Sequence, residues 1–267
     1  MLADLKIIFR RRLAKKASAD CFFVISYPKA GRTWHRLMVG YYLARLTAAR
    51  KGEAFNISRM CRRAGLRPVI YSHNDTGFKD GLKPSSRLVA SPRLWEGHDV
   101  LFLVRNPRDV LVSSFHHATT RSSHFEGTIS QFIRKPETGI AKVMRAYNSW
   151  HSNLRLAASC RVHCYEEMHS DPAAVLRSSL EFFGVTTLDD TLLAEAVEFC
   201  RLENMRRYEQ ANMFEAKQMR NDSGMTQGSK VREGRVGSFA TDLSAADRDF
   251  IDAYIAAVGD PFASYYG

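Results

Sequence analysis

The residues best suited to chemistry stand where an apolar run gives way to a helical pattern. Residues 23–34 read FVISYPKAGRTW. Lys29, Gly31 and Thr33 open the helix, where unpaired N–H groups and a partial positive charge bind phosphate-like anions. The spacing excludes a Walker A loop, in which lysine directly follows the last glycine, because Lys29 precedes Gly31 by two residues.

A second polar group follows the apolar run at 100–104, which is typical of a strand buried on both faces of a parallel sheet. Arg105 comes directly after this run, and Ser113 lies eight residues later. A forked guanidinium and a hydroxyl can hold a phosphate between them. Asp109 is interpreted as a carboxylate that braces a helix end or a loop. Because ligands bind beyond the carboxyl ends of parallel strands, both groups are expected at one site.

Three further stretches carry candidate residues. His73 follows a short apolar run at 69–72, and its pKa range suits a general base, for which Asp75 is the alternative. Residues 164–168 read CYEEM, and residues 231–239 read VREGRVGSF, a basic segment rich in glycine.

Together these motifs resemble those of the cytosolic-type sulfotransferases, which use 3′-phosphoadenosine 5′-phosphosulfate (PAPS). The resemblance covers about residues 21–240. It implies that the first turn holds the 5′-phosphosulfate and that Trp34 packs near the adenine. The residues it assigns to this turn are Lys29, Ala30, Gly31, Arg32, Thr33 and Trp34.

The same resemblance assigns the remaining site residues. Arg105 and Ser113 hold the 3′-phosphate, and Tyr165 lies near the adenine. The segment Arg232, Glu233 and Gly234 folds over the nucleotide. His73 is the base that activates the acceptor hydroxyl, while Lys29 stabilises the leaving oxygen as PAP (3′,5′-ADP) departs.

The chain departs from the family pattern at four positions. Tyr71 stands where lysine is common, and Glu233 stands where a second lysine is usual. Leu202 occupies the place of an adenine-stacking phenylalanine, and Phe239 stands where tryptophan is common. Arg235 is a candidate for the charge that Glu233 does not supply.

The resemblance implies transfer of a sulfuryl group from PAPS to a hydroxyl of a glycan, a lipid-linked acceptor, or a small alcohol or phenol, without a metal. A small-molecule kinase of the P-loop type is one alternative, although the chain lacks a Gly-Lys-Ser/Thr turn. A basic nucleic-acid-binding domain is another, since the net charge is +11. The motif cations gather at loop ends, so no nucleic-acid partner is expected.

Alternating strand and helix patterns predict an α/β fold, and the resemblance makes it a P-loop-like three-layer sandwich with a mainly parallel central sheet flanked by helices. The predicted strands are 21–27, 69–72, 100–104 and 161–165. The predicted helices are 33–49, 107–117, 128–134, 140–158, 172–183, 189–208 and a last helix capped by Ser244. Loop-like regions at 50–68, 74–97, 116–140 and 209–230 are expected to line the acceptor pocket.

The 267 residues divide into a basic N-terminal segment, 1–20, and one domain, 21–267. Residues 5–16 are basic and amphipathic, a pattern that fits an anionic membrane surface and a solvated helix equally well. The five cysteines are odd in number and scattered, which favours a reducing compartment. We therefore expect a cytoplasmic protein, with membrane-peripheral contact through residues 5–16 as the open alternative. Oligomeric state has no signature in the sequence.

Overall fold

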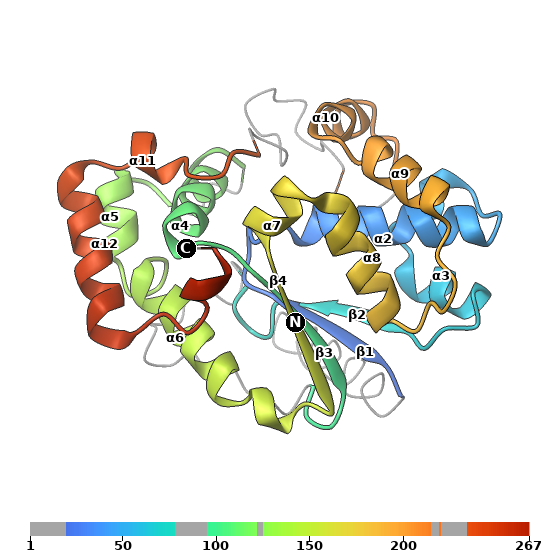
Figure 1. Ribbon diagram of the computed structural model, residues 1–267. Coiled ribbons are helices and arrows are strands. Elements are labelled where there is room, and N and C mark those ends of the chain that lie inside the picture. The colour runs from blue at the N-terminus through green and yellow to red at the C-terminus, as the bar shows by residue number, and fades with distance from the viewer. Residues whose placement is uncertain (1–19, 78–94, 122–124, 215–218, 220–233, 267) are drawn as a thin grey trace, which may run out of the picture.

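A parallel sheet forms the centre of the molecule (Figure 1). The structure is a computed structural model that describes residues 20–77, 95–121, 125–214, 219 and 234–266. Its strands have the spatial order β2-β1-β3-β4, and every pairing is parallel. They are β1 (Phe22–Ser26), β2 (Val69–Ser72), β3 (Asp99–Val104) and β4 (Ser159–Cys164). The predicted parallel α/β architecture is confirmed.

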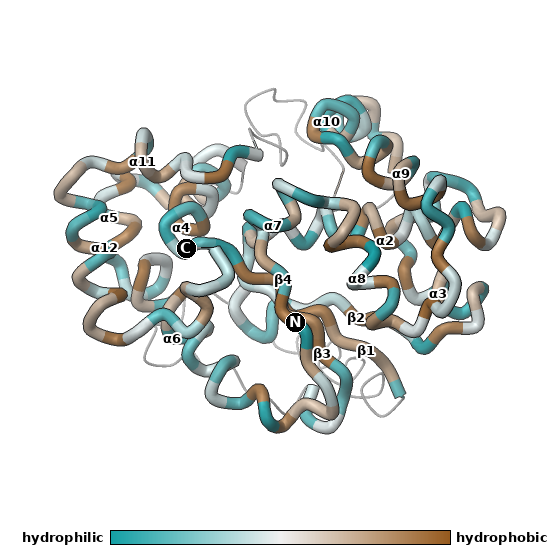
Figure 2. The backbone as a smooth tube through the Cα atoms, in the orientation of Figure 1, coloured by the Kyte–Doolittle hydropathy of each residue, from teal (hydrophilic) through white to brown (hydrophobic). Residues whose placement is uncertain are grey.

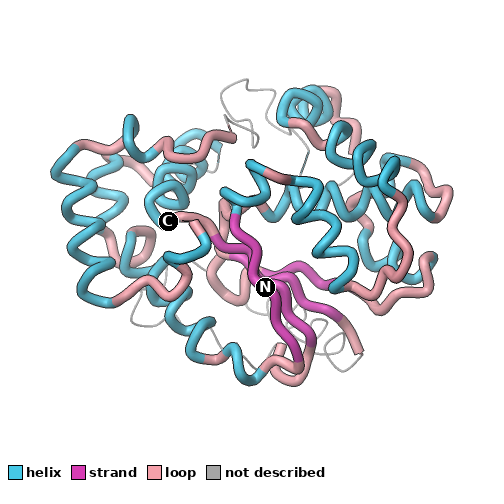
Figure 3. Tube along the Cα trace, viewed as in Figure 1, coloured by secondary structure: helices cyan, strands magenta, loops and turns pink. Residues whose placement is uncertain are grey.

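Helices cover both faces of the sheet, which makes three layers (Figure 3). Successive side chains of β1 point to opposite faces: Phe22 and Val24 join one buried cluster, and Phe23 and Ile25 join the other. Strand β1, buried on both faces, is accordingly apolar along nearly its whole length (Figure 2). The first cluster packs under α2 (Arg32–Leu46), α3 (Ile57–Arg63), α8 (Pro172–Phe182), α9 (Asp190–Phe199) and α10 (Leu202–Gln210). The second packs under α4 (Pro107–His116), α5 (Ile129–Arg134), α6 (Ile140–Ser152) and α12 (Ala245–Val258).

Short elements complete the described fold. They are α7 (Tyr165–Ser170), α11 (Phe239–Asp242), a π-helical turn η4 (His117–Arg121), and the 3-10 turns η1 (Lys51–Glu53), η5 (Leu154–Leu156) and η8 (Ala263–Tyr265). None of the helices in the described part of the chain has the length and apolar character needed to cross a bilayer.

The strand order reverses at the centre of the sheet. From β1 the chain moves to β2 on one side, and it then returns to β3 on the other side. The loop after β1 and the loop after β3 therefore diverge from neighbouring strands. Such a switch point leaves a crevice beyond the strand ends where ligands bind.

Three predicted elements differ from the structure. Region 50–68 was expected to be loop-like, but it contains α3, whose buried face has helical spacing. The chain also forms α7, which the sequence did not predict, so Tyr165 begins a helix rather than ending a strand. Cys164 Sγ accepts a hydrogen bond from Glu167 N (3.2 Å) at the start of α7.

The helix predicted at 189–208 is two helices. It breaks at Cys200 and Arg201, where the Arg201 backbone is extended (φ −57°, ψ 147°). The Asn204 side chain donates to the carbonyl of Glu198 (2.8 Å), which satisfies an acceptor that the break exposes.

The carboxylate of Asp109 joins α4 to the C-terminal part of the chain. It is fully buried and accepts hydrogen bonds from Gly237 N (2.8 Å), Ser238 Oγ (3.0 Å) and Phe239 N (3.1 Å). It also lies 3.4 Å from Nη2 of Arg105. The predicted bracing role of Asp109 is therefore confirmed.

Replacing Asp109 with alanine should lower the free energy of unfolding by about 2–4 kcal/mol, because it leaves a buried guanidinium and two backbone N–H groups without their acceptor. Chemical denaturation measures this change. The matched control is Asp249→Ala, which removes an exposed carboxylate of α12 and should change stability by less than about 0.5 kcal/mol. Equal effects in the two variants would contradict the bracing role.

Candidate active site

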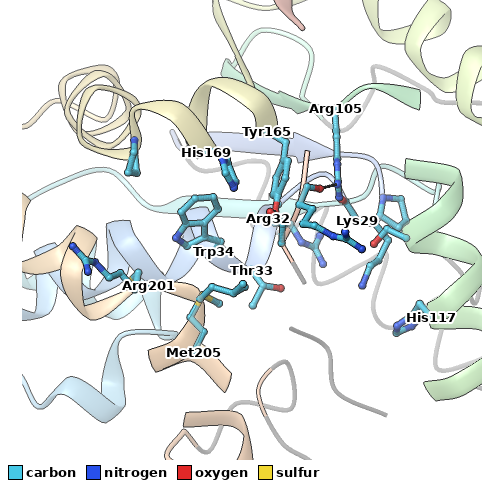
Figure 4. Close-up of a pocket in the computed structure, with 18 of the residues that line it drawn as sticks. Lys29, Arg32, Thr33, Trp34, Arg105, His117, Tyr165, His169, Arg201 and Met205 are labelled. Carbon is cyan, nitrogen blue, oxygen red and sulfur yellow. Dashed lines mark hydrogen bonds between the residues drawn. The ribbon is translucent and has the colours of Figure 1, made fainter. Parts of the chain in front are cut away.

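A cavity of about 550 Å³ opens beyond the carboxyl ends of the strands (Figure 4). It brings together ten of the predicted site residues, which come from five separate stretches of the chain. Ala30 is buried and is not among the lining residues, while Arg232 and Glu233 lie outside the described residues. The ten are Lys29, Gly31, Arg32, Thr33, Trp34, His73, Arg105, Ser113, Tyr165 and Gly234.

The loop after β1 has a backbone that only certain residues tolerate. Gly31 has φ +86°, and a β-carbon there would lie 2.6 Å from Met168 Cε and 2.8 Å from Tyr165 Cδ2. Lys29 also has a positive φ, +73°, an uncommon conformation for a residue other than glycine. Gly31 caps α2 without a side-chain acceptor, and the first turn carries no acidic residue. The helix N-terminus is therefore suited to an external anion.

The side chain of Arg105 contacts several separate segments of the cavity wall. Its Nη1 donates to the carbonyl of Lys29 (3.3 Å), and its Nη2 donates to the carbonyl of Arg235 (2.8 Å) and faces Asp109. The guanidinium carbon lies 4.0 Å from the centroid of the Tyr165 ring. The side chain is 7% exposed, yet its Nε has no hydrogen-bond partner among the described residues. A buried donor without a partner is costly, so this group fits an anionic ligand.

Aromatic and apolar side chains form the part of the cavity wall next to Arg105. Trp34 and Tyr165 meet edge to face with centroids 6.0 Å apart, and the Tyr165 hydroxyl donates to the carbonyl of Gly234 (3.0 Å). Leu202 lies against Gly234, where a β-carbon would come within 2.9 Å of it. The cavity therefore has an apolar, aromatic surface suited to a flat ring.

The hydrogen bonds of His73 define its tautomer. Its Nδ1 lies 2.8 Å from the carbonyl oxygen of Ser26, which can only accept, so Nδ1 carries the proton. In the neutral ring Nε2 then holds the lone pair, as a general base requires.

Asp75 occupies a different environment from His73. Asn74 and Asp75 both have positive φ, and Thr76 N donates to the carbonyl of His73 (2.9 Å), which closes a tight turn of the I′ kind. Asp75 is exposed on this turn and is not among the residues that line the cavity. The geometry favours His73 as the base.

Tyr71 stands at the position where lysine is common in the family pattern, but its side chain does not reach the cavity. The Ser179 hydroxyl donates to Val175 O (2.8 Å), so its oxygen accepts from His35 Nε2 (2.9 Å). Nδ1 of His35 then accepts from the Tyr71 hydroxyl (3.0 Å). Burial lowers the pKa of His35 to about 3, so the network is neutral. Tyr71 is engaged beneath α2 and is not among the lining residues.

Arg32 and Arg36 bring two like charges together one turn apart on α2. Neither has an ion-pair partner among the described residues, and Arg36 donates only to the carbonyl of Phe55. Burial and the neighbouring Arg36 lower the pKa of Arg32 to about 10. A helix N-terminus also disfavours cations. Arg32, which lines the cavity, is therefore held where an anion would stabilise it.

The lining residues that the sequence did not assign to the nucleotide site include two histidines, an arginine and a methionine. His117 lies one helical turn after Ser113, and His169 one turn after Tyr165, so helical spacing could have indicated both. Arg201 and Met205 line the cavity only because the helix breaks before them. Figure 4 shows His117 at the opposite end of the cavity from Arg201 and Met205. Among the described residues no group of three His, Cys, Asp or Glu could hold a metal ion.

Replacing Arg32 with alanine should leave the free energy of unfolding unchanged or raise it by up to about 1 kcal/mol, because the change removes repulsion from Arg36 and from the helix dipole. Thermal unfolding in chloride and in sulfate at equal ionic strength tests this. Sulfate should stabilise the native protein more than the variant. A loss of stability above about 1 kcal/mol would assign Arg32 a packing role instead.

Sequence comparison identifies relatives of this chain. The family model described as Sulfotransferase domain matches residues 19–260. Mouse sulfotransferase 4A1 is 28% identical over 134 residues, which cover 42% of this chain and 45% of that protein, so the chain spans less than half the length of this relative. Human sulfotransferase 1C2 is 24% identical over 255 residues, covering 89% of this chain and 82% of the relative.

Structural comparison agrees. The crystal structure of mouse sulfotransferase SULT7A1 complexed with PAP matches with a TM-score of 0.62 at 18% identity, covering 92% of this chain and 88% of that chain. At this identity the likeness shows the shared fold. Because the family model covers nearly the whole chain, the protein belongs to the sulfotransferase domain family.

Proposed function

We propose that this protein transfers a sulfuryl group from PAPS to an acceptor hydroxyl and releases PAP. The observation that carries the proposal is one cavity that Lys29, the open N-terminus of α2 and the buried Arg105 share. Family membership supports it. The PAP bound to the mouse structural relative supports the choice of nucleotide.

Each wall of the cavity has a role in this proposal. The N–H groups of the loop after β1 and the Thr33 hydroxyl bind the 5′-phosphate. Arg105 and Ser113 bind the 3′-phosphate, for which the unpartnered Nε of Arg105 is a suitable donor. Trp34, Tyr165 and Leu202 form the adenine surface, with Arg232, Glu233 and Gly234 closing over it.

The transfer forms a bond between the acceptor oxygen and sulfur, and it breaks the bond between sulfur and the bridging oxygen. His73 Nε2 takes the proton of the acceptor hydroxyl. Lys29 neutralises the charge that grows on the bridging oxygen as PAP leaves. Positioning and electrostatic stabilisation supply most of the rate, as in phosphoryl transfer, and no step needs a metal.

The acceptor enters from the side of His73. His117, which opens the π-helical turn after α4, lines the same cavity and is available to contact the acceptor. A glycan, a lipid-linked acceptor and a small alcohol or phenol all present the hydroxyl that this chemistry needs. A screen with labelled PAPS across these classes identifies the substrate.

A reducing, cytoplasmic location suits the cysteines. All five lie in the described part of the chain, no disulfide joins them, and four are buried. We include contact of residues 5–16 with an anionic membrane in the proposal, because their sequence is basic and amphipathic.

PAP at about 100 times its Kd should raise the melting temperature by about 5–10 °C, and ATP with magnesium should raise it far less. Lys29→Ala should keep most of the shift with PAP but lose about 10²–10³-fold in PAPS-dependent turnover, because Lys29 acts on the leaving group. Lys135→Ala, at an exposed lysine, is the control. If ATP with magnesium stabilised the protein and PAP did not, the result would favour a kinase. If generic DNA stabilised it and PAP did not, the result would favour a nucleic-acid-binding domain.

Replacing His73 with alanine should lower kcat by about 10²–10⁴-fold with little change in PAP affinity, because the base acts only on the acceptor. Asp75→Ala should retain activity near that of the native protein. Steady-state kinetics with labelled PAPS and calorimetry with PAP separate these effects. An inactive Asp75→Ala together with an active His73→Ala would reverse the assignment.

A further inference from the structure

The positive charge of this protein is concentrated in its first 77 residues. Residues 1–77 contain 16 Lys and Arg against 4 Asp and Glu, while residues 78–267 contain 23 against 24. The first part therefore carries +12 and the rest −1. Of the cations between residues 20 and 77, which the structure describes, only Lys29 and Arg32 line the cavity, so the nucleotide does not account for the other eight.

The outer face of α3 consists of arginines. Ile57, Met60 and Cys61 form its buried face, at helical spacing. The exposed side chains of this helix, Arg59, Arg62 and Arg63, repeat the same spacing on the opposite face. Figure 1 shows α3 at the periphery of the molecule, on the side of the sheet that α2 covers.

Neighbouring groups leave this face strongly positive. Glu53 of η1 pairs with Arg59 (3.0 Å) and lies 3.7 Å from Arg63, so one carboxylate serves two arginines. Arg62 has no ion-pair partner among the described residues. Exposed Arg50 and Lys51 precede Glu53. Leu46, at the end of α2, is 45% exposed beside this basic stretch.

Asp20, the first described residue, is tied to the chain that follows α3. Arg67, four residues after Arg63, pairs with Asp20 (Nη1 to Oδ1, 2.5 Å), and Phe22 N donates to the carbonyl of Pro68 (2.9 Å). The first described residue is thus fixed beside the chain that follows α3. Residues 1–19, whose structure is not described, contain six Lys and Arg and one Asp.

We propose that the α3 face, defined by Arg59, Arg62 and Arg63, docks the protein on a membrane surface rich in anionic phospholipid. Polybasic surfaces gain affinity from each cation near such a surface. A bilayer fits better than nucleic acid or an acidic protein, because apolar side chains accompany the cations. The exposed Leu46, at the end of α2, is such a side chain among the described residues.

Flotation of the full chain with vesicles tests this docking face. Vesicles of phosphatidylcholine with about a third phosphatidylserine should bind the native protein, and vesicles of phosphatidylcholine alone should not. The variant R59Q/R62Q/R63Q should lose about a hundredfold in partitioning, at about fivefold per charge. The control K135Q/R145Q/R155Q removes three exposed cations elsewhere, at Lys135, Arg145 and Arg155, and should change partitioning by less than about threefold.

The outcomes separate the proposal from its rivals. The docking proposal would be overturned if R59Q/R62Q/R63Q partitioned to anionic vesicles as well as the native protein does. It would also be overturned if K135Q/R145Q/R155Q lost as much partitioning as R59Q/R62Q/R63Q, because the effect would then depend on net charge alone. If R10Q/R11Q/R12Q lost partitioning to anionic vesicles and R59Q/R62Q/R63Q did not, vesicle binding would be assigned to the N-terminal segment instead. The proposal would also be overturned if the native protein bound duplex DNA more tightly than anionic vesicles at the same ionic strength. The PAP-induced thermal shift should persist in R59Q/R62Q/R63Q, so a failed nucleotide assignment is detected separately.

Discussion

The buried ion pair between Arg105 and Asp109 is the constraint on which the cavity depends. Removing two charges from water is costly, and a buried pair persists only when further hydrogen bonds satisfy both partners. Asp109 meets this condition through three donors of the segment 237–239. Arg105 meets it only in part, because its Nε has no partner among the residues that the structure describes. The pair thus holds together the loop after β1, α4, α7 and the segment 237–239.

The charge of the site lies in its walls, while the layer beneath α2 is neutral. The network of Tyr71, His35 and Ser179 satisfies its buried polar atoms without a charge, since His35 stays unprotonated. A protonated His35 would add a third cation beneath Arg32 and Arg36. Tyr71, which stands where lysine is common in the family pattern, therefore belongs to this neutral network.

The sequence predicted the elements that carry strong local signals. Val69–Ser72 and Pro107–His116 were predicted to within a residue, because buried strands and a proline at the first helical turn leave clear patterns. The break before Arg201 had no such signal, as it lacks glycine and proline and depends on packing. Arg201 and Met205 were missed for that reason. The Asp109 contacts with residues 237–239 join segments more than 120 residues apart, so the sequence indicated a brace without its partner.

Helix α2 links the nucleotide cavity with the basic face of α3. Its N-terminus lines the cavity, and its 15 residues extend about 22 Å from there. Gly40, midway along it, allows close approach of the chain before α3, since a β-carbon there would lie 1.8 Å from the Ala54 carbonyl oxygen. Arg36 donates to the neighbouring Phe55 carbonyl and shares the first turns with Arg32. The packing of the chain before α3 against α2 therefore fixes where the arginines of α3 lie relative to the cavity at the N-terminus of α2.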